Sequence, residues 1–383
     1  MIPRGRPDIG WSDLLAGLFY CLYPRRDPPA IDWPAPGAIT VLSVRSGLDL
    51  LLQAMCWPAG SEVLMSGVTI PDMMAIVRGH GFVPVAVDID PRTLATDPSE
   101  LARRASDRTR GVLIAPLFGS RSSLEKIGSL AKDRGWFLIE DAAQAFAGRA
   151  YPGDPAADAA LFSFGPIKTA TALGGGLLSV REPDLRQRIV EIQSHQPTAP
   201  QLAFARRCLL FAGLKLLTTR TGYGLFCRWL RRRGRDVDDV LAGMVRGFGG
   251  EGLERFRRRP CAPLARLMLR RIEQNHAPRL AKRRSAGHSL LASVPAANRI
   301  GDLAAHHDFW VFPVRSDRPD ELVAALREKG VDASRRASSL VAIDGEALGC
   351  RALTEQAVYV PLATSSAALS SALAAVEGPL DAG

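Results

Sequence analysis

The segment 137–180 constrains this chain more strongly than any other. An apolar run at 137–139 predicts a buried parallel strand, and this strand ends in an acidic pair whose second member is Asp141. A second apolar run at 159–164 leads through a Gly-Pro turn to a single lysine, Lys168, and a glycine triplet follows. Because open α/β sheets bind ligands outside the carboxyl ends of their strands, this order predicts a ligand site at one edge of a sheet.

A lysine and a carboxylate at such an edge favour carbonyl chemistry through an amine. A lysine that is desolvated among apolar neighbours loses part of its preference for the ammonium form, so its amine can condense with an aldehyde. A buried carboxylate beside a heterocyclic nitrogen keeps that nitrogen protonated, which is how pyridoxal phosphate (PLP) becomes an electron sink. Lys168 and Asp141 are therefore the candidate catalytic pair.

The same segment resembles a known family. The string EDAAQA, the string FSF, a lysine five residues after the serine and the triplet GGG together resemble the DegT/DnrJ/EryC1/StrS family of PLP-dependent aminotransferases, whose known members mostly aminate nucleotide-linked keto-sugars. The resemblance covers roughly residues 40–195 and continues more weakly to the C-terminus. It implies the α/β PLP-dependent transferase fold (fold type I, like aspartate aminotransferase). That fold has a large, mostly parallel-sheet domain and a small C-terminal α+β domain, and the alternation of strands and helices favours the same sheet.

Carried over by position, the resemblance gives a role to each of four residues. Lys168 would form the Schiff base with PLP, and Asp141 would pair with the pyridinium nitrogen. Gln144 would lie near the ring hydroxyl, and Ser163 would donate its hydroxyl to the cofactor phosphate. Taken singly, such residues are also typical helix caps, turn residues or surface lysines. Their order and spacing together favour a PLP site.

Two positions depart from the family pattern. Where the family has Ser-Gly-Thr after its first strand, this chain has Ser46, Gly47 and Leu48, so one phosphate-binding hydroxyl is missing. The strand, the turn and the helix start still predict an anion site, with the backbone amides of Gly47 and Leu48 as donors. Near Ile70 the family has an aromatic residue that stacks on the pyridine ring. Ile70 either covers that ring without stacking or belongs to the core.

Three further family features are altered downstream. His195 stands where the family often has a histidine–glycine pair, either as a cofactor or substrate contact or as an ordinary polar loop residue. The asparagine that family members extend to the neighbouring subunit's phosphate is not evident in the arginine-rich stretch 255–259, where an arginine could replace it. The family's sugar-binding histidine–tyrosine pair is replaced at 333–340 by ASRRASSL, which predicts a different substrate pocket.

The composition limits the compartment and the kinds of site. The 383 residues, 47% of them hydrophobic, suffice for two domains with sizeable cores. The six cysteines have neither C-x-x-C nor His-paired spacing, which argues against a zinc site or a disulfide framework and for a reducing cytoplasm. The sequence has no convincing signal peptide and no run long enough to span a membrane. We therefore expect no metal and a cytoplasmic protein, at most peripheral at the inner membrane face.

The net charge of +10 is concentrated in one part of the chain. Residues 201–300 hold 22 Lys or Arg against six Asp or Glu. Within 201–235, nine basic residues and no acid alternate with leucines and aromatic residues, which predicts two short amphipathic helices. Three interpretations stay open: a helical hairpin over the active-site mouth, a segment in a membrane interface, and a funnel for an anionic substrate. Nucleic acid is disfavoured as a partner because no nucleic-acid motif is present.

We expect five segments along the chain. They are an irregular N-terminal arm (1–37), a large PLP-binding domain (38–200), a basic amphipathic helical insertion (201–250), linking helices (251–296) and a small C-terminal α+β domain (297–383). The resemblance also implies a homodimer, because sites of this family are often completed across a two-fold interface.

The residues and the resemblance together predict a PLP-dependent aminotransferase. An amino acid such as glutamate would donate the amino group to an anionic keto substrate, for example a phosphate-activated keto-sugar, with Lys168 moving the proton as general acid and base. Two alternatives stay open: a PLP enzyme of the same fold that transfers an acyl group or forms carbon–carbon bonds, and a membrane-associated relative without catalysis. Lys168 argues against the family's dehydratase branch, which has a histidine at that position.

Overall fold

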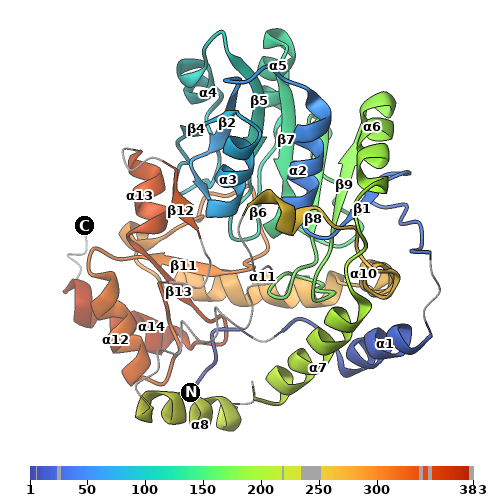
Figure 1. Cartoon of the computed structure of the whole chain (residues 1–383). Helices are drawn as coiled ribbons and strands as arrows, with labels where there is room; N and C mark the ends of the chain where they lie inside the picture. Colours follow the sequence, from blue (N-terminus) through green and yellow to red (C-terminus); the bar gives the residue numbers. More distant parts are fainter. Residues whose placement is uncertain are drawn as a thin grey trace.

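Within residues 1–5, 7–23, 27–217, 220–233, 252–335, 340–343 and 347–378, which the computed structural model describes, a seven-stranded sheet forms the centre of the larger part of the molecule (Figure 1). Its strands are β1 (Ile39–Val41), β2 (Glu62–Ser66), β4 (Val83–Val87), β5 (Thr109–Ile114), β7 (Phe137–Asp141), β8 (Ala159–Ser163) and β9 (Gly176–Val180). They lie in the order β1-β9-β8-β7-β5-β2-β4.

The sheet is mostly parallel, so the α/β fold predicted from the sequence is confirmed. Strands β4, β2, β5, β7 and β8 run in one direction, and β9 runs opposite to both of its neighbours. Strands β2 and β8 are buried along their whole length, as is typical of parallel strands covered on both faces. Because β1 is antiparallel to β9, it points the same way as β8, and the carboxyl ends of β1, β7 and β8 meet at one edge.

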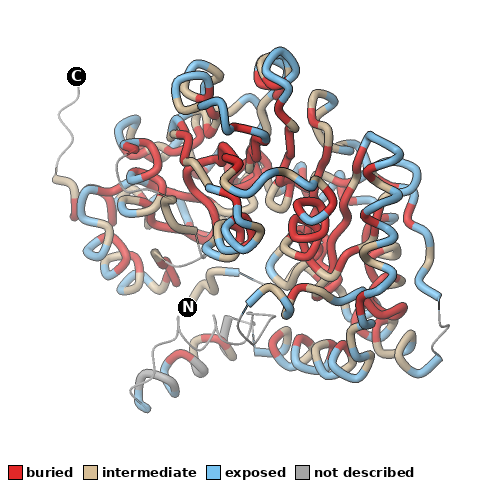
Figure 2. The backbone as a smooth tube through the Cα atoms, turned by 45° about the horizontal axis from the view of Figure 1, so that its top comes forward, coloured by how far each residue is buried: buried red, intermediate tan, exposed pale blue. Residues whose placement is uncertain are grey.

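Alternate strand residues pack against helices on the two faces of the sheet. On one face, Leu113 and Leu161 pack with α2 (Val44–Met55) and α3 (Pro71–Gly79), and α6 (Pro183–Ser194) lies beside α2. On the other face, Val112 packs with α4 (Pro98–Arg104) and α5 (Glu125–Arg134). Phe162, also on that face, packs with α1 (Trp11–Leu22), α7 (Gln201–Leu217) and α10 (Ala262–Glu273). Figure 2 shows the buried residues concentrated in the strands.

Helix α1 replaces the irregular structure that the sequence predicted for the N-terminal arm. That prediction was wrong because α1 is stabilised by tertiary packing, which outweighs the proline-rich composition of its flanks. Leu14 and Gly17 are buried, and a Cβ atom added at Gly17 would lie 3.1 Å from the Sγ of Cys208 in α7 and 3.3 Å from Leu267 in α10. The close approach of three helices therefore requires a glycine in α1.

The basic segment forms two helices, as predicted, namely α7 and α8 (Arg220–Arg232). Helix α8 begins at Arg220. The segment predicted as linking helices contains the 3-10 turn η2 (Leu253–Phe256) and two helices, α10 and α11 (Ala277–Ala292). The apolar stripe of α10 is buried, and this stripe comprises Leu264, Leu267, Met268 and Ile272.

The C-terminal part pairs β11 (Phe312–Arg315) with β13 (Ala357–Val360), and α12 (Pro319–Glu328) and α14 (Ser366–Glu377) pack beside them. The smaller elements are β3 (Val68–Thr69) paired with β12 (Val341–Ala342), β6 (Ser120–Arg121) paired with β10 (His306–His307), η1 (Ala142–Gln144), η3 (Ala296–Asn298) and α13 (Leu348–Thr354). Strand β11 does not extend back to Phe309, because Phe309 has φ of 46° and the amide of Trp310 donates to the carbonyl of Phe118.

Part of the altered sugar-binding motif, residues 336–339, lies outside the described residues. None of the helices in the described ranges is both long and apolar enough to cross a membrane.

Arg271 joins three parts of the chain beneath the carboxyl edge of the sheet. Its guanidinium, 2% exposed, donates to Asp13 of α1 over 2.8 Å and to the carbonyl of Thr171 over 3.1 Å. It also donates to the carbonyl of Asp8. Burial lowers the pKa of Arg271, and the charge of Asp13 opposes that effect. The N-terminal residues, α10 and the loop that carries Lys168 are thus held together by one buried cation.

Replacing Arg271 with leucine should lower the free energy of unfolding by about 3 kcal/mol, because the buried carboxylate of Asp13 loses its closest charged partner. The expected loss is not larger than this, since Arg270 and Gln274 still donate to Asp13. Urea unfolding followed by circular dichroism measures the change. Arg266→Leu is the control, because Arg266 is a half-buried arginine of the same helix that makes no hydrogen bond within the described residues. Equal losses in the two variants would contradict a specific role for the ion pair.

Candidate functional site

Lys168 lies in the loop after β8, at the carboxyl edge of the sheet. Its backbone amide donates to Gly165 over 3.0 Å, which makes a tight turn. Its Nζ lies 4.3 Å from the centre of the Trp310 ring, and the Trp310 indole donates to the carbonyl of Ile167 over 2.9 Å. Trp310 comes from the C-terminal part of the chain, and the sequence analysis did not identify it. An aromatic face so close to an ammonium both attracts its charge and excludes water.

The structure brings Asp141 into electrostatic contact with Lys168. Asp141 ends β7, is 9% exposed, and accepts a hydrogen bond from the amide of Ala143 over 3.1 Å. Burial raises the pKa of Asp141, and the charge of Lys168 partly offsets this. Burial also lowers the pKa of Lys168 to about 8, while Asp141 acts to raise it and Arg45 acts to lower it. Near neutral pH, Lys168 is therefore present as the free amine to a greater extent than an ordinary lysine.

Ser163 and Gln144 flank this pair, and each has a hydrogen-bond donor that no other group uses within the described residues. The Oγ of Ser163 accepts from the amide of Gly165 over 3.4 Å, so its own proton stays available to an anion. The Oε1 of Gln144 accepts from the amide of Phe118 over 2.8 Å, and its NH₂ group has no partner within the described residues. Both residues lie at the ends of neighbouring strands, as the sequence predicted.

The start of α2 differs in detail from the predicted anion site. Ser43 caps this helix and accepts the amide of Ser46 on its side chain (3.1 Å) and the amide of Gly47 on its carbonyl (3.0 Å). The expectation that the amide of Gly47 binds an anion was wrong, because the helix already uses it. Gly47 instead allows close packing, since an added Cβ would lie 2.7 Å from the side chain of Leu161, and Leu48 is fully buried. The helix terminus still directs its dipole at this edge.

Two other predicted positions lie apart from the Lys168 loop. Ile70 precedes α3 as its half-buried N-cap residue and packs against the core under α2. His195 is an exposed residue that ends α6, which agrees with the ordinary polar interpretation. Within the described residues no hydrogen bond or ring contact joins either of them to Lys168.

Distant residues fix the loop that carries Lys168. Asp8 accepts from the amide of Ala170 over 2.9 Å, and Arg283 of α11 donates to the hydroxyl of Thr169 over 2.9 Å. Ala170 has a positive φ of 57°, a conformation that a non-glycine residue adopts only when its surroundings impose it. The sequence analysis did not identify Asp8 or Arg283, because each is far from the loop along the chain.

A group of arginines surrounds the approach to this edge. Arg45 and Arg255 share Asp72, at 2.6 and 2.7 Å. The guanidinium of Arg207, from α7, lies against Gly174 of the glycine triplet, where an added Cβ would be 3.6 Å from its Nη1. Burial lowers the pKa of Arg207, and Arg45 lowers it further. Because Arg207 has no carboxylate partner within the described residues, an anionic ligand would relieve this repulsion.

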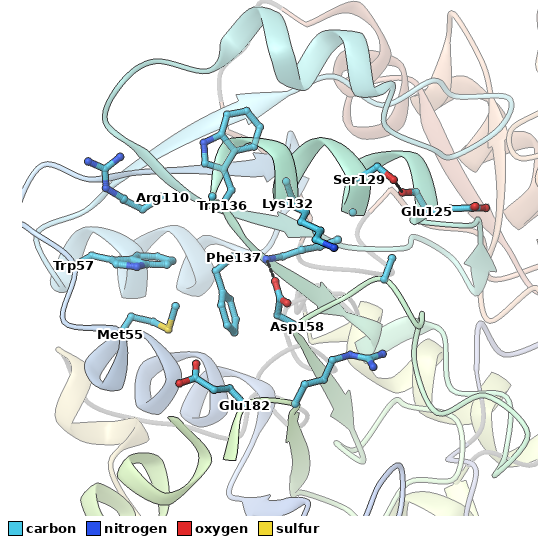
Figure 3. A pocket seen from close by; sticks show the side chains of 16 residues that line it. Met55, Trp57, Arg110, Glu125, Ser129, Lys132, Trp136, Phe137, Asp158 and Glu182 are labelled. Atoms are coloured by element: carbon cyan, nitrogen blue, oxygen red, sulfur yellow. Dashed lines mark hydrogen bonds between the residues drawn. The ribbon is translucent and has the colours of Figure 1, made fainter. Parts of the chain in front are cut away.

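A groove lies at the opposite edge of the sheet (Figure 3). It has a volume of about 900 Å³ and is lined by residues at the amino ends of β5 and β7, such as Arg110 and Phe137, together with Trp57. Since Asp141 ends β7 and Phe137 begins it, this groove is separated from Lys168 by the length of the strand. It is not the candidate site.

Residues 34–206 match the family described as the DegT/DnrJ/EryC1/StrS aminotransferase family. The matching segment is a little less than half of the chain. It contains Asp141, Gln144, Ser163 and Lys168, which the fold brings to one edge of the sheet.

The curated relatives match over part of their length. The chain is 31% identical over 192 residues to L-glutamine:2-deoxy-scyllo-inosose aminotransferase of Streptomyces fradiae, which covers 45% of this chain and 45% of that protein. It is 31% identical over 156 residues to the pleiotropic regulatory protein of Geobacillus stearothermophilus, which covers 39% of this chain and 42% of that protein. The matching stretches thus span less than half the length of these relatives.

The likeness among solved structures extends over nearly the whole chain. The aminotransferase TlmJ from Streptoalloteichus hindustanus has a TM-score of 0.72 and 19% sequence identity, covering 98% of this chain and 100% of that chain. At this identity the likeness shows the fold, including the C-terminal part that the family segment leaves out.

The charges around Lys168 predict opposite pKa shifts in two variants. Asp141→Asn should lower the pKa of Lys168 further, because a neighbouring negative charge is lost; more amine is then present at neutral pH. Arg45→Gln should raise that pKa and leave less amine. The pH dependence of reductive methylation of Lys168 by formaldehyde and cyanoborohydride, read by mass spectrometry on cofactor-free protein, measures both. The exposed Lys132 is the internal reference. A shift of both variants in the same direction would contradict the assigned electrostatics.

Proposed function

We propose that this protein is a PLP-dependent aminotransferase that moves an amino group from an amino acid to an anionic keto compound. One observation carries the proposal: within the segment that matches the family, the half-buried Lys168 interacts electrostatically with the carboxylate of Asp141, and its pKa is lowered to about 8. A lysine in this state is a nucleophile near neutral pH, whereas an exposed lysine is not.

The residues at this edge fit PLP. The carboxylate of Asp141 has an oxygen to spare for a protonated ring nitrogen, because its one hydrogen bond within the described residues comes from Ala143. Ser163 has a free hydroxyl proton for the phosphate, beside the N-terminus of α2. Gln144 can donate its NH₂ group to the ring hydroxyl. When bound, PLP supplies an electron sink for the bonds at the amino-acid α-carbon.

Lys168 supplies the base as well as the attachment point. With a pKa of about 8, its amine would accept a proton and return it near neutral pH. Trp310 limits the movement of the amine and keeps water away from it. Asp8 and Arg283 hold the backbone of the loop so that the amine stays at the sheet edge.

The arginines support an anionic substrate. Arg207, which has no carboxylate partner within the described residues, lies beside the glycine triplet and suits a phosphate or carboxylate group. The printed name of the Streptomyces fradiae relative gives L-glutamine as the donor and 2-deoxy-scyllo-inosose as the acceptor. We therefore favour glutamate or glutamine as the donor and a polyhydroxylated keto compound carrying a negative charge as the acceptor.

The assembly and location form part of the same proposal. We infer a homodimer, since sites of the resembled family are often completed by a neighbouring subunit, and a cytoplasmic location. The free cysteines, four of them buried, support a reducing compartment.

Cofactor binding and turnover test the main proposal. The purified protein should gain a visible absorption band with PLP, and this band should decay when glutamate is added. Lys168→Ala should lose the response to glutamate by a factor of about 10³ or more, because both the nucleophile and the base are removed. Lys132→Ala, at the opposite edge of the sheet, is the control. If saturating PLP gave no band at all, the non-catalytic alternative would replace this proposal.

Binding of a diphosphate probe tests the anionic substrate. With the PLP-loaded protein, uridine diphosphate should bind Arg207→Gln about tenfold more weakly than the wild type, because a charge-assisted contact is lost. Isothermal titration calorimetry measures the affinity. Arg206→Gln is the matched control, since Arg206 is the neighbouring residue but faces solvent. Equal weakening by both variants would leave only nonspecific charge attraction.

A further inference from the structure

The outer face of α7 is apolar along its whole length. Leu202, Leu209 and Leu216, spaced seven residues apart, are 61%, 59% and 64% exposed. The other exposed residues of this helix are Ala203, Arg206, Leu210, Gly213 and Leu217, so one charge lies among eight outward positions. The inner face is apolar as well, with Phe204, Cys208 and Phe211 buried in the core. A helix with apolar residues along both its buried and its exposed face is normally covered on both faces.

Helix α1 extends this surface. Trp11, Leu15, Phe19 and Leu22 recur every three or four residues and are 46%, 64%, 55% and 76% exposed. The two helices are in contact through Gly17 of α1, and Figure 1 shows α1, α7 and α8 along one edge of the molecule, on the far side of α11 from the sheet. We call the exposed residues of α1 and α7 named here the α1–α7 apolar surface. Large exposed apolar side chains on two adjoining helices favour an interaction site at this edge.

The charged residues of α7 and α8 are all basic. The sequence 201–235 contains nine basic residues and no acid, and Arg206, Arg228, Arg232 and Arg233 are exposed. The one acid of α1, Asp13, is buried against Arg270 and Arg271 and does not offset them. Exposed leucines and aromatic residues flanked by arginines are typical of segments that lie in the interface of an anionic bilayer.

We propose that the α1–α7 apolar surface docks the protein on an anionic lipid bilayer. The leucines and aromatic residues enter the boundary between headgroups and acyl chains, and Arg206 of α7 and the exposed arginines of α8 contact lipid phosphates. This surface lies in the plane of the membrane, since the described residues contain no helix able to span it.

Two other occupants fit the surface less well. A second copy of the chain would meet it through a two-fold contact, which would bring two acid-free basic surfaces together and repel. The exposed leucines do not cover the active site either. The inner face of α7 packs towards Phe164 and Leu173 of the lysine loop, and the leucines lie on the opposite, exposed face. Docking would thus hold the membrane on the side of α7 opposite to the Lys168 loop.

Vesicle flotation tests the proposal with the full-length, PLP-loaded protein. Vesicles of phosphatidylcholine with about 30% phosphatidylglycerol should carry the wild-type protein upward, and pure phosphatidylcholine vesicles should carry several-fold less. Leu209→Glu combined with Leu216→Glu should reduce the bound fraction about tenfold. Two side chains that insert into the bilayer are then replaced by charges of the same sign as the lipid. Raising the salt concentration should weaken binding of the wild type.

The control places the same two charges on exposed leucines elsewhere. Leu303 and Leu348 are 56% and 78% exposed and lie outside α1, α7 and α8. Leu303→Glu combined with Leu348→Glu should float like the wild type, and circular dichroism should show that both double variants are folded. The proposal is overturned if the wild type does not float with anionic vesicles, or if the two double variants lose binding equally. It is also overturned if the charges in α7 only convert a dimer to a monomer in light scattering, since the surface would then be a subunit interface.

Discussion

The functional part of the structure depends on the ion pair and hydrogen bonds of the buried Arg271 guanidinium. It reaches Asp13 in α1, the carbonyl of Asp8 and the carbonyl of Thr171 in the lysine loop. A charge with this little exposure is tolerated only when carboxylates and carbonyls replace its water. The position of Lys168 and the position of the N-terminal helix are therefore set by the same group.

This arrangement couples the proposed chemistry to the edge of the molecule formed by α1 and α7. The two helices pack over a core cluster that includes Phe164 and Leu173, which bracket the lysine loop. Burial of that loop lowers the pKa of Lys168, and the same packing positions α7 so that Arg207 faces inward and the leucines face outward. One helix thus contributes to the electrostatics of the site and to the proposed membrane contact.

The strands and most helices were predictable because their signals are local. Buried parallel strands are short apolar runs, and the strand ends at Asp141 and Ser163 follow directly from those runs. Helix α1 was missed because its stability comes from contacts with α7 and α10 instead of from its own sequence. The predicted role of the Gly47 amide was also wrong, since capping by Ser43 depends on backbone geometry that a motif does not reveal.

The sequence by itself determined the mostly parallel sheet, because its strands can be read from hydrophobicity, and the resemblance to the family supplied the candidate residues Asp141, Gln144, Ser163 and Lys168. Only the tertiary structure decided what surrounds Lys168. Trp310 is on its amine and Arg207 is against the glycine triplet, and Asp8 holds its loop. Residues so far apart along the chain meet only when the core forms, since no local pattern records which distant side chains will fill the same space.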